Sequence, residues 1–243
     1  MAYTDYNEIT DRGIKDNVFA MRAFQVHYTN FMFYTINVAT PGFIEEGTYN
    51  TRRKGTRRID FVPFYRWRSG PVVETNRPLD FYLDASSRGF FVIKFPTTFV
   101  YTRDGRFRLD SRNRLVTMSG HYPVMGEGGE IFLPEGSVSV ARSGMIFVDG
   151  EPVDRIKVAV FKSFKDMQNM ETLNGSFFIL TKPIDTLEGQ EHYGVVQGYL
   201  EENNVLKAIT GDILFAKNSF DVNAKSAQML NRALSTSASF IAP

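Results

Sequence analysis

The sequence predicts an α+β protein in which helices from both termini form a coiled-coil-like bundle, accompanied by a central all-β domain of the barrel or sandwich kind. Two observations carry this prediction. Apolar residues recur at alternating steps of three and four near each end of the chain, which is the spacing of a helical seam. The long stretch between the ends instead contains short alternating segments separated by Asp-Gly and Asn-Gly pairs, which are typical of β-hairpins.

The first element is a helix expected over residues 16–38. The tripeptide Thr40-Pro41-Gly42 ends it, because proline lacks an amide donor and disfavours helix at the residue before it. The same-face apolar positions define the N-terminal seam, which consists of Ile14, Met21, Phe24, Tyr28, Phe31, Thr35 and Val38.

An extended linker follows over residues 44–70 and contains a basic loop. The five cations of this loop are Arg52, Arg53, Lys54, Arg57 and Arg58. Three interpretations remain open: a solvated loop, contact with an acidic face of a neighbouring subunit, or binding to nucleic acid phosphates. The last has no accompanying nucleic-acid-binding motif. After the loop, Pro63 restricts its segment to an edge strand or an irregular stretch.

The β-rich domain is expected over residues 71–202. Asp104-Gly105, Asp149-Gly150 and Asn174-Gly175 each lie beside alternating apolar runs and predict hairpin turns. Residues 164–173 predict one short helix within this domain. The recurring turns favour a sandwich or barrel.

The last element is a helix that begins after the N-cap residues Asn203-Asn204 and runs to about residue 235. Its apolar stripe, the C-terminal seam, has alternating steps of three and four and consists of Leu206, Ile209, Ile213, Ala216, Phe220, Asn223, Ala227, Leu230 and Leu234. Residues 1–43 and 203–243 together form the expected helical assembly domain. The seams could equally pack on the β core of a monomer, and their positions at the two chain ends favour assembly.

Composition and motifs give no support for an enzyme, a cofactor or a metal centre. The chain has 243 residues, a formal net charge of +1, no cysteine and only three histidines. None of the histidines lies at metal-ligand spacing from another, and no phosphate-binding glycine loop or nucleophile elbow occurs. Adjacent carboxylates such as Glu201-Glu202 are interpreted as solvated charges. We also expect no cleaved signal peptide, no membrane span, no nucleic acid partner and no small-molecule substrate.

An ordered set of motifs resembles the bacterial flagellar rod and hook family. The set covers most of the chain and consists of Asn37-Val38-Ala39-Thr40-Pro41-Gly42-Phe43, Arg77-Pro78-Leu79-Asp80, the block from Gly89-Phe90-Phe91-Val92 through Tyr101-Thr102-Arg103-Asp104-Gly105-Arg106-Phe107, Gly120-His121 through Gly128-Gly129, and Phe220-Asp221-Val222-Asn223-Ala224-Lys225. Within the family, Thr40-Pro41-Gly42-Phe43, Arg77-Pro78-Leu79-Asp80 and Gly120-His121 look most like the proximal-rod protein.

The resemblance implies a structural subunit of the flagellar basal body, located in the periplasmic rod and not an enzyme. It implies export by the flagellar type III apparatus without a cleaved signal. It also implies polymerisation with itself and with other axial subunits into the rod that transmits motor torque. The helices would then form an inner tube and the β domain an outer shell.

Two alternatives remain. One is a distal-rod or hook subunit of the same family. The other, from a different class, is a surface- or carbohydrate-binding β module with helical oligomerisation arms, for which Tyr65, Trp67 and Tyr82 would supply exposed aromatic platforms.

Overall fold

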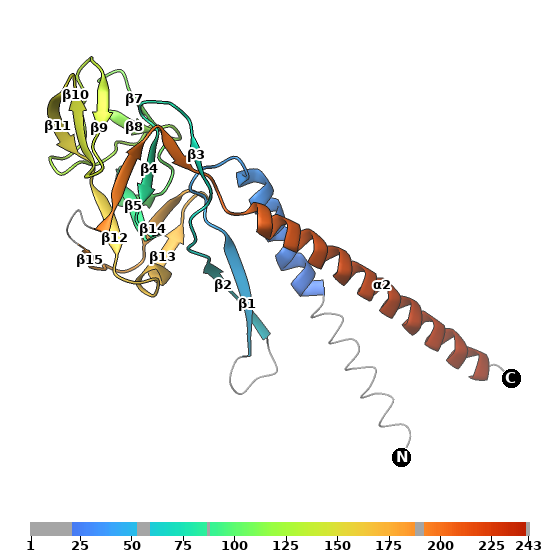
Figure 1. The fold of residues 1–243 in the computed structure, drawn as a ribbon. Coiled ribbons are helices and arrows are strands. Elements are labelled where there is room, and N and C mark those ends of the chain that lie inside the picture. Colours follow the sequence, from blue (N-terminus) through green and yellow to red (C-terminus); the bar gives the residue numbers. More distant parts are fainter. Residues whose placement is uncertain (1–20, 53–58, 87, 188–191, 242–243) are drawn as a thin grey trace. The chain divides into compact units, whose positions relative to one another are not determined.

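The computed structural model describes residues 21–52, 59–86, 88–187 and 192–241 (Figure 1). Contacts within the chain divide it into two compact units. The β unit is Asn37–Val205, and the helical unit comprises the described parts of Met1–Ile36 and Leu206–Pro243.

The helical unit contains one long helix and one shorter helical segment. The long helix, α2, spans Leu206–Ile241 and has 36 residues, which corresponds to a length of about 54 Å. It continues past the predicted end near residue 235, because no proline follows until Pro243. The N-terminal segment is helical over residues 21–37 and ends just before Thr40-Pro41-Gly42, as predicted.

The predicted fold class is wrong in the share of helix and in the coiled-coil-like bundle of terminal helices. The described chain forms seventeen strands, and its α-helices are α2 and residues 21–37. A coiled coil needs seam residues that insert between those of a partner helix over a matching length. Ile213 and Phe220, in the middle of the C-terminal seam, are instead exposed. Periodicity identified helices correctly, but it does not determine which face is covered within one chain.

The largest sheet of the β unit has six strands and is antiparallel at every pairing. In sheet order these strands are β13 (Met170–Thr172), β14 (Phe177–Leu180), β6 (Phe99–Thr102), β5 (Gly89–Lys94), β12 (Val158–Phe161) and β15 (Thr186–Leu187). The run before β13 contains a 3₁₀ turn, Asp166–Asn169, where a short helix over 164–173 was predicted. The remainder of that segment pairs with β14, so tertiary pairing overrides the local helical pattern.

Smaller sheets complete the β unit. A three-stranded sheet has the order β11 (Glu151–Arg155), β10 (Met145–Val148) and β9 (Val138–Val140). Two-stranded pairs are β1 (Glu46–Arg52) with β2 (Ile59–Tyr65), β3 (Val72–Glu74) with β17 (Tyr199–Glu201), β4 (Phe81–Asp84) with β16 (Gly194–Gln197), and β7 (Phe107–Leu109) with β8 (Leu115–Thr117).

Both faces of the six-stranded sheet are buried, each by a different apolar core. Successive side chains along a strand point to opposite faces, so one strand contributes to both cores. Phe91 and Ile93 of β5 join the larger apolar core, and Phe90, which directly precedes Phe91, joins a second core around Trp67. In the same way, Phe177 faces the larger core and Phe178 faces the second. The pattern explains why β5 reads as a continuous apolar run rather than an alternating one.

Two of the three predicted hairpin turns are confirmed. Asp149 and Gly150 connect β10 to β11 with φ values of 51° and 89°, as a two-residue turn of the primed type requires. Gly175 lies between β13 and β14 with a φ of 84°.

The hairpin prediction at Asp104-Gly105 is wrong. The strand before this pair, β6, pairs with β5 and β14, and the strand after it, β7, pairs with β8. Gly105 is required there because the backbone of Phe81 passes against it, and a Cβ atom would lie 1.7 Å from the Phe81 oxygen. The glycine therefore allows close contact between two backbones rather than a tight hairpin.

Candidate assembly surface and the junction of the chain ends

The N-terminal seam is largely accessible over its described residues. Met21, Tyr28 and Val38 are exposed, whereas Phe24 and Phe31 are half-buried. The rings of Phe24 and Tyr28 stack along the helix with centroids 6.1 Å apart. Thr35 is exposed and donates its hydroxyl to the carbonyl of Phe31. Ile14 lies outside the described residues.

The C-terminal seam on α2 is similarly uncovered where its side chains are described. Ile213 is 51% exposed and Phe220 is 67% exposed, while Ile209 is half-buried. The side chains of the other seam positions lie outside the described residues: Leu206, Ala216, Asn223, Ala227, Leu230 and Leu234.

A second apolar stripe lies on the opposite side of α2 and was missed by the heptad analysis. Phe215, Val222 and Met229 follow one another at steps of seven, and all three are exposed. At 3.6 residues per turn, this stripe lies about 180° around the helix from Ile213 and Phe220. The signal is present in the sequence, because Phe215, Val222 and Met229 recur at heptad spacing. A helix with apolar stripes on opposite sides needs partners on both sides to bury them.

A ring contact joins the two described helices of the helical unit. His27 of the N-terminal segment and Phe215 of α2 have ring centroids 4.0 Å apart. Phe215 belongs to the second stripe, and neither residue belongs to the predicted seams. The contact therefore leaves Ile213 and Phe220 free for other partners.

The predicted basic loop joins the strands of the β1–β2 hairpin. Residues 53–58, which include Arg53, Lys54, Arg57 and Arg58, lie outside the described residues, as does the side chain of Arg52. The hairpin pairs seven residues with seven, from Glu46 with Tyr65 to Arg52 with Ile59. In this two-stranded sheet Pro63 lies in an edge strand, as predicted.

Arg103 and Glu201 form a buried ion pair that sequence reasoning missed. Their side chains are 1% and 3% exposed. Both Nε and Nη2 of Arg103 donate to Oε2 of Glu201, with the Nε contact at 3.1 Å. The amide of Gly70 donates to the other carboxylate oxygen at 2.9 Å. The interpretation of Glu201-Glu202 as solvated charges is therefore wrong for Glu201, whose carboxylate is buried against Arg103.

Backbone contacts bring the two ends of the β unit to the same place. The amide of Gly42 donates to the carbonyl of Glu201 at 2.9 Å. The side-chain amide of Asn203 donates to the carbonyl of Val38. Gly42 has a φ of 66°, and a Cβ there would lie 2.4 Å from the carbonyl carbon of Arg103. We call this set of contacts the junction.

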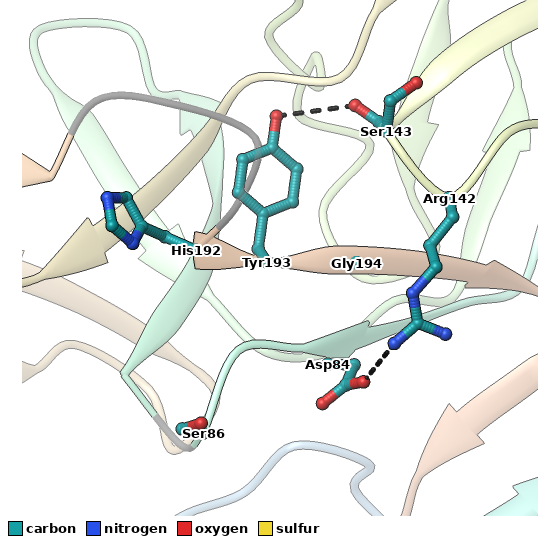
Figure 2. A pocket seen from close by; sticks show the side chains of 7 residues that line it. All are labelled: Asp84, Ser86, Arg142, Ser143, His192, Tyr193 and Gly194. Atoms are coloured by element: carbon teal, nitrogen blue, oxygen red, sulfur yellow. Dashed lines mark hydrogen bonds and ion pairs between the residues drawn. The ribbon is translucent and has the colours of Figure 1, made fainter.

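One pocket of about 590 Å³ opens on the β unit (Figure 2). Its lining is mainly polar and consists of Asp84, Ser86, Arg142, Ser143, His192, Tyr193 and Gly194. Arg142 and Asp84 form an exposed ion pair at 2.6 Å across one side. The hydroxyl of Tyr193 points to the carbonyl of Ser143 at 3.5 Å, and burial raises the pKa of this phenol.

A network of surface ion pairs connects the end of β5, the turn before β8 and the segment around Glu130. Glu130 accepts hydrogen bonds from Lys94 at 2.7 Å and Arg114 at 2.9 Å, and these cations hold the pKa of Glu130 below its ordinary 4.5. The backbone amides of Arg114 and Arg112, together with the Arg114 guanidinium, lower the pKa of Asp110.

The described residues contain neither a metal-binding cluster nor a helix that could span a membrane. They include no grouping of three or more His, Asp or Glu side chains that could hold a metal ion. None of the described helices combines the length and apolar character that a membrane crossing needs.

Comparison with known proteins identifies similarity to flagellar hook and rod proteins. The family model described as "Flagellar hook protein FlgE/F/G D1 domain" matches residues 86–148. The flagellar basal-body rod protein FlgF of Buchnera aphidicola subsp. Baizongia pistaciae is 29% identical over 84% of this chain and 88% of its own length. FlgG of Buchnera aphidicola subsp. Schizaphis graminum is 28% identical over 79% and 73%. FlgF of Escherichia coli is 27% identical over 78% and 82%.

Proposed function

Because this chain belongs to the bacterial flagellar rod and hook family and is similar to its rod proteins, we propose that it is a structural subunit of the basal-body rod, in the proximal segment. The family is structural rather than enzymatic. In this proposal the subunit polymerises with itself and with other axial subunits, and the resulting rod transmits motor torque.

The observation that supports polymerisation best is the exposed apolar surface of α2. Ile213 and Phe220 lie on one side of this helix and Phe215, Val222 and Met229 on the other. A monomeric protein gains nothing by leaving two apolar stripes of one helix in water. Neighbouring subunits would bury both stripes, and each buried large apolar side chain contributes about 1.5–3 kcal/mol.

The described N-terminal seam adds further surface to the proposed interface. Met21, Tyr28 and Val38 are exposed in the single chain and are available to a neighbour. We assign assembly to residues 1–43 and 203–243, a linking role to residues 44–70 and an outer position to residues 71–202. A head-to-tail contact between two different surfaces extends a polymer without closing it, as a rod requires.

The basic loop is proposed to contact an acidic face of an adjacent subunit. Five cations lie within seven residues, Arg52 to Arg58. Such a density of like charge is self-repelling unless a partner supplies carboxylates, which arginine can bind through two hydrogen bonds.

Delivery by the flagellar type III export apparatus completes the proposal. Export through a narrow channel requires an unfolded chain. Terminal segments whose apolar faces lack partners gain little from folding before assembly, so they stay compatible with export.

The carbohydrate-binding alternative loses its main support. Trp67 is 8% exposed and packs on Phe90 and Phe178 in the second core. Tyr65 is half-buried, and its hydroxyl accepts the amide of Thr172 at 3.2 Å. These rings hold the β unit together and do not form a platform for a sugar.

The test is the presence of the chain in purified basal bodies. Basal bodies would be isolated from wild-type cells and from cells in which assembly stops before the distal rod. A proximal-rod subunit is present in both preparations, whereas a distal-rod subunit is present only in the first. Absence from both would overturn the proposed function.

A further inference from the structure

The junction joins four segments of the β unit at one buried ion pair. Arg103 comes from the turn after β6, and Glu201 is the last residue of β17. Gly42 follows the N-terminal helical segment, and Ser69 and Gly70 follow β2. Arg103 Nη2 also donates to the hydroxyl of Ser69 at 3.1 Å, so the guanidinium itself contacts two of the other three segments.

The chain passes between the β unit and the helical unit at two points. Along the sequence, each point is close to residues that form the junction. One point follows residue 36 and the other follows residue 205. Asn203 ties the second point to the first, because its side-chain amide donates to the carbonyl of Val38. Its Oδ1 accepts the amide of Val205 at 3.3 Å.

A buried ion pair is a poor way to gain stability alone. Removing two charges from water costs several kcal/mol per ion, and well-packed apolar residues of similar volume are often as stable or more stable. Arg103 also keeps one nitrogen, Nη1, buried without a hydrogen bond among the described residues. What the pair supplies is geometry: an Arg fork and a carboxylate accept only a narrow range of mutual positions.

We propose that Arg103 and Glu201 are positioning residues that fix where both terminal segments leave the β unit. With the pair in place, the backbone of Glu201 is held against Gly42, and Asn203 reaches Val38. Without it, β17 still pairs with β3, but the two crossing points are free to move relative to each other. Insofar as this positioning serves assembly, the inference rests on the proposed function.

The test compares three variants of the full-length monomer by amide hydrogen exchange. The first replaces the pair by apolar residues, Arg103→Met with Glu201→Met. The second is Arg103→Lys, which keeps the charge but loses the fork. The control, Arg114→Met with Glu130→Met, removes a surface ion pair of the same β unit.

Gly42 is the diagnostic amide, because its acceptor is the backbone carbonyl of Glu201, which the substitution leaves in place. We expect its exchange to accelerate about tenfold or more in the Met pair. Exchange at Val92, whose amide bonds to Lys157 across the largest sheet, should change by less than about threefold, because the core stays intact. Arg103→Lys should lie between, and the control should leave Gly42 unchanged.

Unchanged exchange at Gly42 in a folded Met pair would overturn the proposal. Equal acceleration at Gly42 and Val92 would also overturn it, since the pair would then serve only global stability. If the Met pair does not fold, Arg103→Lys decides by the same comparison of the two amides.

A second readout tests the consequence for assembly. Cells that carry a folded Met pair should show loss of rod assembly and swimming, whereas cells with the control should swim. If Gly42 exchange accelerates but swimming is normal, the pair fixes the crossing points without serving assembly, and that part of the proposal is wrong. Failure of the proposed function would appear differently, as absence of the unaltered chain from basal bodies.

Discussion

Phe220→Asp separates a role in assembly from a role in folding. The Phe220 side chain is 67% exposed, and a buried phenylalanine covers about 200 Å². About 130 Å² therefore remains for a neighbour to bury, which is worth about 3 kcal/mol at about 25 cal/mol per Å². Losing this term alone weakens each contact about a hundredfold, and a buried unpaired carboxylate adds a further cost.

The monomer should tolerate the same substitution. An exposed position away from caps and ion pairs changes the free energy of unfolding by less than about 0.5 kcal/mol, so the thermal unfolding of the β unit stays the same. The matched control is Gln228→Asp, which adds the same charge at an exposed position of α2 between the two apolar stripes.

The assay is swimming together with recovery of rods from cells that express each variant. Phe220→Asp should abolish both, and Gln228→Asp should leave both intact. Normal rods in the Phe220→Asp strain would refute the assignment of this stripe to an interface. Loss in both strains would show that added charge anywhere on α2 is harmful, and would refute the face-specific argument.

Three further predictions concern the β unit and the basic loop. Gly42→Ala should lower the free energy of unfolding by more than about 1 kcal/mol, because the new Cβ would meet the backbone of Arg103. Gly150→Ala, at a glycine with a positive φ but nothing within 4 Å of a new Cβ, should lower the free energy of unfolding, measured by chemical denaturation, by less. Equal losses in the two variants would contradict the steric argument. The lowered pKa of Glu130 contributes stability that is present above its unfolded pKa and is lost as the pH falls through the lower folded value. Below about pH 4.5, melting temperatures should therefore fall less steeply with pH in Glu130→Gln than in the unaltered chain. Parallel profiles of melting temperature against pH would contradict this. Replacing Arg52, Arg53, Lys54, Arg57 and Arg58 with Ser should lower recovery of intact basal bodies in a salt-dependent way; equal recovery for both proteins at low and high salt would make the loop a solvated surface.

Local signals in the sequence predicted local structure well. Asp149-Gly150 forms the predicted turn because both residues adopt positive φ, which their own chemistry permits. Thr40-Pro41-Gly42 ends the N-terminal helix for equally local reasons. The period of the C-terminal seam predicted α2, although the absence of a breaker carried the helix on to Ile241.

Features set by distant parts of the chain could not be predicted in this way. Gly105 resembles a hairpin glycine, but its requirement comes from Phe81 in another strand. Glu201 resembles a solvated charge, and only the fold shows that it faces Arg103. The seams predicted which residues are apolar on a helix face, whereas their partners depend on neighbours that a single sequence does not specify. The bundle within one chain was wrong for this reason.

The measurement that tests the central claim most directly is electron cryotomography of basal bodies in cells that lack this protein. A structural subunit of the proximal rod leaves a defined gap: the inner-membrane ring is present, the rod beyond it is missing, and no hook follows. Expression of the unaltered chain should restore the rod. A complete rod and hook in the deletion strain would contradict the account.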